Sequence, residues 1–138
     1  MRLQHDCLIL TNNELVRKIL GKQYEIAFFG ECSYRDILIK TRDLVYAGHR
    51  LYTHPLAGSV KPNETPYRSV AVSKSAPGMD AAEAEIIANA IVTYDKFTPR
   101  GRVLTEQVRG DFRLIDYTLL CGALDIDAAA GLSDTDQY

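Results

Sequence analysis

Short apolar runs alternate with segments of helical periodicity along most of the chain. Residues 6–11 form an apolar run whose length fits a buried strand. Residues 15–20 then place apolar side chains at helical spacing, and residues 24–29 are a second run of almost only apolar residues. Residues 37–45 again carry one apolar helical face, which Gly48 ends. The pattern predicts a strand, a helix, a second strand and a second helix, in that order.

Residues that cap helices stand where these helices should begin. The side chains of Asn, Asp, Ser and Thr accept the first free backbone N–H groups of a helix. Ser33 with Asp36 resembles a capping box, in which Asp replaces the usual Glu or Gln. We expect the last helix to bury a face made of Val108, Phe112, Ile115 and Leu119. The expected N-caps are Asn12 or Asn13, Ser33, Asp80 and Thr105.

The alternation predicts an α/β domain. We expect a three-layer α/β/α sandwich with a short, mainly parallel sheet of about four strands, in a flavodoxin-like or Rossmann-like order. Residues 50–53 would be the third strand and residues 68–73 the fourth. The connection between these two strands contains no helix, so the fourth can also be antiparallel. If the first and third strands are neighbours, Asn12 or Asn13 lies close to His54.

We expect a single domain over residues 1–132. The end of the chain is acidic and polar, which predicts a disordered tail at residues 133–138.

One proline-rich stretch, residues 53–67, has a composition unlike the rest of the chain. It holds three of the five prolines, at positions 55, 62 and 66. Proline fixes its own φ and keeps the preceding residue out of the helical region. The stretch is therefore a long, stiffened loop, and long ordered loops in compact domains are usually functional. We predict that it forms the working surface of the protein.

Several side chains of this loop are candidates for chemistry, each with a structural alternative. His54 is the candidate catalytic residue, as an acid or base at a strand end, unless its ring only caps a backbone carbonyl. Gly58 and Ser59 with Lys61 could form an anion cradle, or serve a turn beside a solvated lysine. Glu64 could be a general base, or pair with a neighbouring cation.

Asn12 and Asn13 are expected as caps, and one of them can also face a ligand at the start of a helix. Among the cysteines, only Cys32 lies just before a helix N-cap, where the pKa of a thiol can be lowered. The predicted ligand-binding residues are Asn12, Asn13, His54, Gly58, Ser59, Lys61, Asn63, Glu64 and Thr65.

The composition narrows the class of protein. The chain of 138 residues is 46% apolar and 25% charged, values typical of one soluble globular domain. A net charge of -2 gives no basis for a nucleic-acid partner, and the apolar runs are too short to span a membrane. The first six residues lack the apolar core of a signal peptide, so we expect a cytoplasmic protein. Three widely spaced cysteines predict neither a disulfide framework nor a metal site, and no cofactor is indicated.

The residues of the loop resemble a known family. The motif His-Pro-Leu-Ala-Gly-Ser-Val-Lys-Pro-Asn-Glu-Thr-Pro-Tyr at 54–67 is similar to the GrdX family, as are Thr-Asn-Asn at 11–13 and Gly-His at 48–49. The resemblance covers residues 7–97. Members of this family are small proteins encoded alongside glycine reductase components in anaerobic bacteria. The resemblance implies a cytoplasmic accessory role in reductive amino-acid metabolism, and it supplies no catalytic residues.

Two functions follow from these observations. The first is an accessory protein that uses the loop to bind a small anionic metabolite or a partner, such as a glycine reductase component. The second is a small enzyme that acts on a carboxylate or phosphate substrate, with His54 as acid or base and Lys61 or Arg68 holding the anion. Either function is compatible with a homodimer. A concave pocket at the loop would favour a ligand, and a flat apolar surface would favour a protein partner.

Overall fold

A three-stranded mixed sheet lies among helices in the computed structural model, which describes residues 6–56, 61–97 and 103–133. The strands are β1 (Leu8–Thr11), β2 (Glu25–Phe28) and β3 (Ser69–Val72), in the order β2-β1-β3. β1 pairs with β2 in parallel and with β3 in antiparallel orientation. The expected sheet of about four mainly parallel strands in a flavodoxin-like or Rossmann-like order is therefore wrong, whereas the antiparallel alternative for the strand at residues 68–73 is confirmed.

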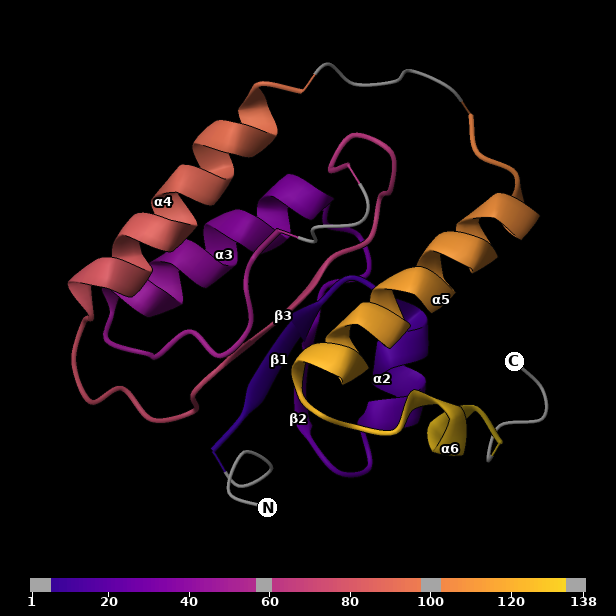
Figure 1. Cartoon of the computed structure of the whole chain (residues 1–138), viewed down its shortest axis with the longest axis horizontal. Helices are drawn as coiled ribbons and strands as arrows, with labels where there is room; N and C mark the ends of the chain where they lie inside the picture. Colours follow the sequence, from indigo (N-terminus) through magenta and orange to yellow (C-terminus); the bar gives the residue numbers. More distant parts are fainter. Residues whose placement is uncertain (1–5, 57–60, 98–102, 134–138) are drawn as a thin grey trace.

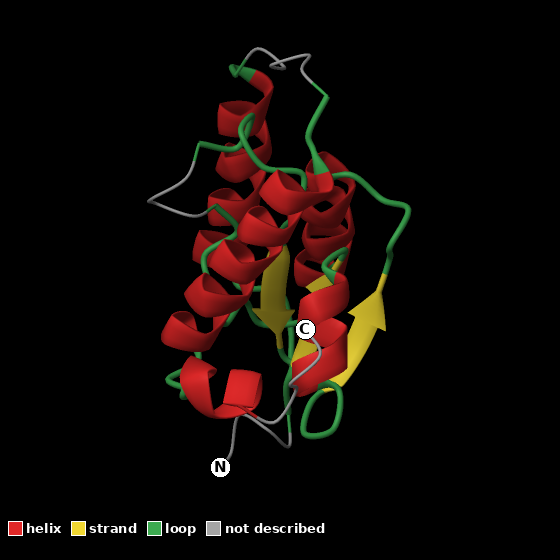
Figure 2. Cartoon of the chain, turned by 90° about the vertical axis from the view of Figure 1, so that its right-hand side faces the viewer, coloured by secondary structure: helices red, strands yellow, loops and turns green. Residues whose placement is uncertain are grey.

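Helices cover both faces of this sheet. α3 (Tyr34–Tyr46) packs on β1 and β3, and α4 (Ala81–Asp95) packs on α3. α2 (Glu14–Leu20) and α5 (Glu106–Ala123) lie on the opposite face, where α6 (Ala128–Ser133) packs on both. Figure 1 shows α3 and α4 on one side of the strands and α2 and α5 on the other, and Figure 2 shows the strands among the helices.

Residues 50–53, the expected third strand, form a single bridge between Leu51 and Val72 and no strand. The Tyr52 N–H donates to the Ala71 carbonyl and the Ser73 N–H to the Arg50 carbonyl, but side chains take the place of the other backbone acceptors of the ladder. Thr53 Oγ1 accepts the Ala71 N–H over 3.0 Å, and Ser73 Oγ accepts the Arg50 N–H over 2.7 Å. Local side-chain acceptors of this kind compete with a regular backbone ladder.

The expected contact between the first and third strands is also wrong. Val72 pairs with Leu8 of β1 and forms the bridge with Leu51, so β3 lies between β1 and residues 50–53. The proline-rich loop at residues 53–67, here called the proline loop, reverses the chain. This reversal places β3 between β1 and residues 50–53. A parallel neighbour would have needed a crossover connection instead of a reversal.

The predicted helix starts are confirmed. Asn13 rather than Asn12 is the N-cap of α2, and Ser33 with Asp36 forms a complete capping box at α3. Asp80 caps α4 and Thr105 caps α5. Gly48 follows the end of α3 with φ +116, a backbone region that favours glycine.

The buried face of α5 differs from the expected one. Its buried residues are Asp116, Tyr117, Leu120 and Cys121, whereas Ile115 of the predicted face is 38% exposed. The helix is turned because Asp116 accepts buried hydrogen bonds from β3, and a carboxylate in the core needs such donors.

The end of the described chain contains a helix that the sequence analysis did not assign. α6 packs Ala128 and Leu132 against the core, and the Tyr117 hydroxyl donates to the Ala128 carbonyl over 2.9 Å. The remainder of the expected tail, residues 134–138, lies outside the described residues. None of the helices in the described ranges is long and apolar enough to cross a membrane.

Glu83 at the start of α4 fixes residues 50–51 to this helix. Its carboxylate accepts from Arg50 Nε over 3.0 Å and from the Leu51 N–H over 2.9 Å. The hydrogen bond from Arg50 is the main reason that the pKa of Glu83 is lowered below its usual value of 4.5. A lowered folded-state pKa means that the ionised form stabilises the fold.

We predict that Glu83→Gln lowers the free energy of unfolding at neutral pH by about 1 kcal/mol, a modest value because the Arg50 side chain is 44% exposed. The stabilisation is present above the unfolded-state pKa and is lost as the pH falls through the lower folded-state pKa. Urea denaturation should therefore show the gap between wild type and variant closing below about pH 4.5. Glu85→Gln, at an exposed site of the same helix, is the control. A gap that does not change with pH would contradict the assignment.

Candidate ligand pocket at the end of the sheet

Thr11, Asn12 and Asn13 at the carboxyl end of β1 form the centre of a buried polar network. The Thr11 and Ser69 hydroxyls lie 2.6 Å apart, and Thr11 Oγ1 also accepts the Asn13 N–H over 2.9 Å. Asn13 Nδ2 donates to Asp116 Oδ2 over 3.0 Å. Asp116 also accepts the Ser69 N–H over 3.1 Å and the Ser69 hydroxyl over 2.6 Å. The network thus joins β1, β3 and α5.

The Asn12 side chain joins two loops to this network. Its Nδ2 donates to the Cys32 carbonyl over 2.9 Å and to the Pro66 carbonyl over 2.8 Å. Its Oδ1 accepts the Arg68 N–H over 3.0 Å. The residue is 6% exposed, so these bonds are shielded from water. The turn after β2 and the end of the proline loop are held together by one amide group.

A pocket of about 250 Å³ opens where these two loops meet. The carboxyl ends of the parallel strands β1 and β2 lie at this edge of the sheet, a common place for ligands in α/β folds. We call it the edge pocket. Its lining residues are Asn12, Gly30, Cys32, Ser33, Tyr34, Thr65, Pro66, Tyr67, Tyr94 and Arg109.

Hydroxyl, amide and aromatic groups line the edge pocket, and among its described lining residues only Arg109 carries a formal charge. No ion pair joins this arginine to a carboxylate within the described ranges. Burial raises the pKa of Tyr94, so this hydroxyl remains protonated at neutral pH. The lining therefore offers hydrogen-bond donors and one positive charge, which suits an anion.

A second, smaller cavity of about 10 Å³ adjoins the edge pocket. Tyr34, Thr65 and Tyr67 line both spaces. We call it the inner cavity. It is lined by Tyr34, Thr65, Tyr67, Arg68, Phe112, Ile115, Asp116 and Leu119.

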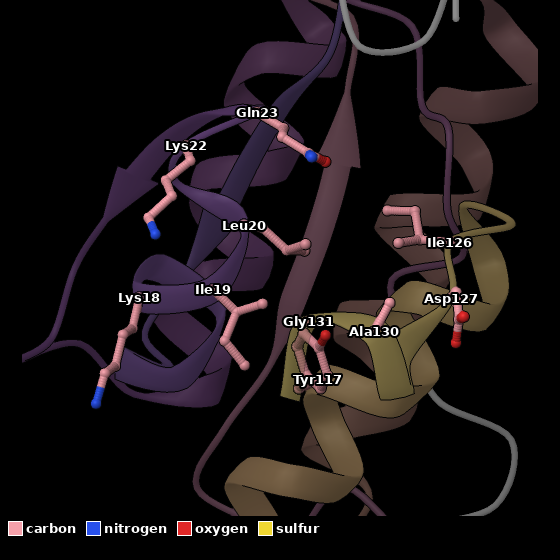
Figure 3. Close-up of a pocket in the computed structure, with 10 residues that line it drawn as sticks. All are labelled: Lys18, Ile19, Leu20, Lys22, Gln23, Tyr117, Ile126, Asp127, Ala130 and Gly131. Atoms are coloured by element: carbon pink, nitrogen blue, oxygen red, sulfur yellow. The ribbon is translucent and has the colours of Figure 1, made fainter. Parts of the chain in front are cut away.

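A third space lies at the other end of the domain, between the end of α2 and α6 (Figure 3). It is also about 250 Å³ in volume, and Ile19, Tyr117 and Gly131 are among its lining residues. Figure 3 shows the ammonium groups of Lys18 and Lys22 pointing away from Tyr117 and Gly131. Since its cations turn outward, this space is a weaker candidate for an anion than the edge pocket.

Two of the predicted ligand-binding residues, Asn12 and Thr65, line the edge pocket. The polar atoms of Asn12 are engaged by protein groups, and Thr65 Oγ1 accepts the Tyr67 N–H over 3.1 Å. Asn13 faces α5 instead, where its amide donates to the Arg113 carbonyl over 2.9 Å.

The other predicted residues do not line the edge pocket. His54 is exposed, and its Nδ1 lies 3.0 Å from the Leu56 amide nitrogen, within its own loop. Lys61 is exposed, and its N–H donates to Glu64 over 3.2 Å, which closes a turn. Asn63 is half-buried in this turn. The predicted cradle residues Gly58 and Ser59 lie outside the described residues.

Sequence reasoning missed Ser33, Tyr34, Tyr94, Arg109 and Asp116 as parts of this region. The sequence predicts Ser33 and Thr105 only as helix starts, and the fold shows that the first turn of α5 carries Arg109 to the edge pocket. The one sequence signal that could have indicated this region was Asp116, a carboxylate beside the apolar face of the last predicted helix. No group of three or more His, Cys, Asp or Glu side chains within the described ranges could hold a metal ion.

These features define a small α/β domain with a polar, cationic pocket at the carboxyl edge of its sheet. A family model described as GrdX-like protein matches residues 8–125. Because this match covers most of the chain, the chain belongs to the GrdX family. The match continues past residue 97, where the recognised resemblance ended, and includes all of α5. No curated protein and no solved structure matches the chain.

We predict that Asn12→Ala lowers the free energy of unfolding by about 2–3 kcal/mol, because it leaves two carbonyls and one N–H without their shared partner. Urea denaturation measures this loss. Asn89→Ala, at an exposed position of α4, is the matched control and should change stability by at most about 0.5 kcal/mol. Equal effects of the two substitutions would show that Asn12 does not hold the loops.

Proposed function

We propose that this protein is a non-catalytic accessory protein of glycine reductase metabolism that binds a small anionic metabolite in the edge pocket. Membership of the GrdX family supports the metabolic association and a cytoplasmic location. The observation that carries the ligand class is the charge of the pocket: among the described lining residues, Arg109 is the only charged one, beside hydroxyl, amide and aromatic groups.

The volume of the edge pocket limits the size of the ligand. Sites for drug-sized ligands measure roughly 300–1,000 Å³. A pocket of about 250 Å³ is better matched to a molecule of a few heavy atoms than to a nucleotide. Glycine, acetate, acetyl phosphate and inorganic phosphate are the compounds of this size that the proposed metabolic setting suggests.

The enzyme alternative has less support. His54, its candidate acid or base, is directed at the backbone of Leu56 and is not a lining residue of the edge pocket. Of its two candidate anion clamps, Lys61 is exposed in a separate turn, and Arg68 lines the inner cavity. A catalytic acid or base has to reach the reacting atoms, and His54 does not lie at the pocket that would hold them.

A partner protein is the other alternative for the proline loop. Leu56 and Tyr67, which would have to be exposed on a docking surface, are half-buried. Pro55 and Pro62 are buried. The described part of the loop therefore favours a concave ligand site over a flat apolar contact surface.

Cys32 allows a direct test, because it lines the edge pocket and is half-buried, whereas Cys7 and Cys121 are fully buried. Burial raises the pKa of Cys7 to about 11, which further suppresses its reaction. We predict that iodoacetamide alkylates Cys32 alone in the native protein. A bound ligand should slow this reaction by the factor 1 + [L]/Kd, about tenfold at a concentration of nine times Kd. Mass spectrometry of the alkylated peptides measures the rate at each cysteine.

Cys32→Ser is the control and should remove the label from the folded protein. Protection by at least one of these four small compounds, each of which carries a carboxylate or phosphate group, with no effect of sodium chloride at equal ionic strength, is the expected result. Protection only by a glycine reductase component would replace the metabolite with a protein partner. If none of these compounds or components protects Cys32, the proposed site is wrong.

A further inference from the structure

Arg68 is a buried cation with no carboxylate partner in the described part of the chain. The residue is 6% exposed. Its Nη2 donates to the His54 carbonyl over 3.4 Å, a long contact, and its Nε has no hydrogen-bond partner among the described residues. Burial of an unpaired guanidinium strongly disfavours the folded state, so such a group needs a compensating partner.

Asp116 does not supply this partner, although it lines the same inner cavity. Its two oxygens accept from Ser69 and Asn13, all of them neutral donors. No ion pair joins the Arg68 guanidinium to the Asp116 carboxylate in the described part of the chain. The cavity thus contains a buried carboxylate that is satisfied by hydrogen bonds and a buried guanidinium that is not.

The inner cavity connects this guanidinium to the edge pocket. Tyr34, Thr65 and Tyr67 line both spaces, so the inner cavity, which Arg68 also lines, adjoins the edge pocket. Tyr67 is half-buried, and its hydroxyl accepts from Arg113 Nη1 over 2.9 Å. The inner cavity itself, at about 10 Å³, has room for a single water molecule.

We propose that Arg68 binds the carboxylate group of a small monocarboxylate, which enters through the edge pocket and displaces the Tyr67 ring from between the two spaces. This inference rests on the proposed function and assigns the class of its ligand. The Nε and Nη2 atoms of arginine form one planar edge that matches the two oxygens of a carboxylate. In Arg68 one of these donors has no partner in the described chain and the other has only the long contact to His54.

The surroundings select a monocarboxylate over phosphate. The inner cavity is too small for a tetrahedral dianion without a larger displacement than a planar carboxylate needs. Asp116 also repels a dianion more strongly than a monoanion. Phe112, Ile115 and Leu119 add an apolar wall that suits a short hydrocarbon group.

The test is thermal unfolding of the full chain with sodium acetate, glycine, sodium phosphate and sodium chloride at matched ionic strength. Acetate in excess over its Kd should raise the Tm of the wild type by about 2 °C or more, and chloride and phosphate should not. Arg68→Met should raise the Tm of the unliganded protein by about 3 °C, because it removes an unpaired buried charge, and should abolish the response to acetate.

Two further variants give the charge and geometry controls. Arg68→Lys keeps the charge without the planar edge and should weaken acetate binding by about tenfold, equivalent to one charged hydrogen bond. Arg42→Met removes a partly exposed arginine of α3, which pairs with Asp43, and should leave the acetate response unchanged.

Each contrary outcome overturns a defined part of the inference. Arg68→Met with an unchanged acetate response would show that Arg68 does not bind the anion. An unliganded Arg68→Met protein that is less stable than the wild type would show that Arg68 is a structural residue. If phosphate protects Cys32 and no monocarboxylate stabilises the wild type, the edge pocket remains the site and the carboxylate assignment is wrong.

Discussion

The buried carboxylate of Asp116 is the constraint on which the end of the sheet depends. It accepts hydrogen bonds from the Ser69 backbone, the Ser69 hydroxyl and the Asn13 amide, and it is 4% exposed. A carboxylate in the core is tolerated only when its oxygens are satisfied, so these contacts fix α5 against β1 and β3. They turn α5 so that Tyr117, Leu120 and Cys121 enter the core. The half-exposed face that results forms one wall of the inner cavity.

The neighbouring Asn12 extends this constraint from the sheet to the loops. By bonding Cys32, Pro66 and Arg68, its amide holds the turn after β2 beside the end of the proline loop. The edge pocket is the space left between these two segments. The same residues therefore stabilise the fold and shape the candidate site. This explains why Asn12 and Asn13 were predicted to bind a ligand, although their side-chain amides form hydrogen bonds with protein groups.

Local signals in the sequence were sufficient for the starts of α2, α3, α4 and α5, and insufficient for α6, for the buried face of α5 and for the sheet. The caps Asn13, Ser33, Asp80 and Thr105 were predictable because a cap acts within one helical turn. The sequence left the direction of β3 open, and its pairing with β1 was not predictable, because this pairing depends on how a long loop reverses the chain. Residues 50–53 have the composition of a strand, but the side chains of Thr53 and Ser73 replace part of its backbone ladder.

In the candidate site, too, some residues could be predicted from local sequence signals and others could not. Thr65 and Cys32 could be chosen from the sequence because they lie in a stiffened loop and before a helix start. Arg109 and Asp116 could not, because only the packing of α5 brings them to the end of β1. Arg68 was noticed as a cation near the loop, but its burial depends on the register that places Ser69 opposite Thr11.

Native-state hydrogen exchange at the Arg68 and Ser69 amides tests the central claim that this polar network fixes the end of the sheet. Both N–H groups donate to side chains, to Asn12 over 3.0 Å and to Asp116 over 3.1 Å. If the network is the constraint, both amides exchange only on global unfolding and match the protection of the Ile9 amide in the core. Exchange of these two amides at the rate of the exposed loop, while Ile9 stays protected, would contradict the claim.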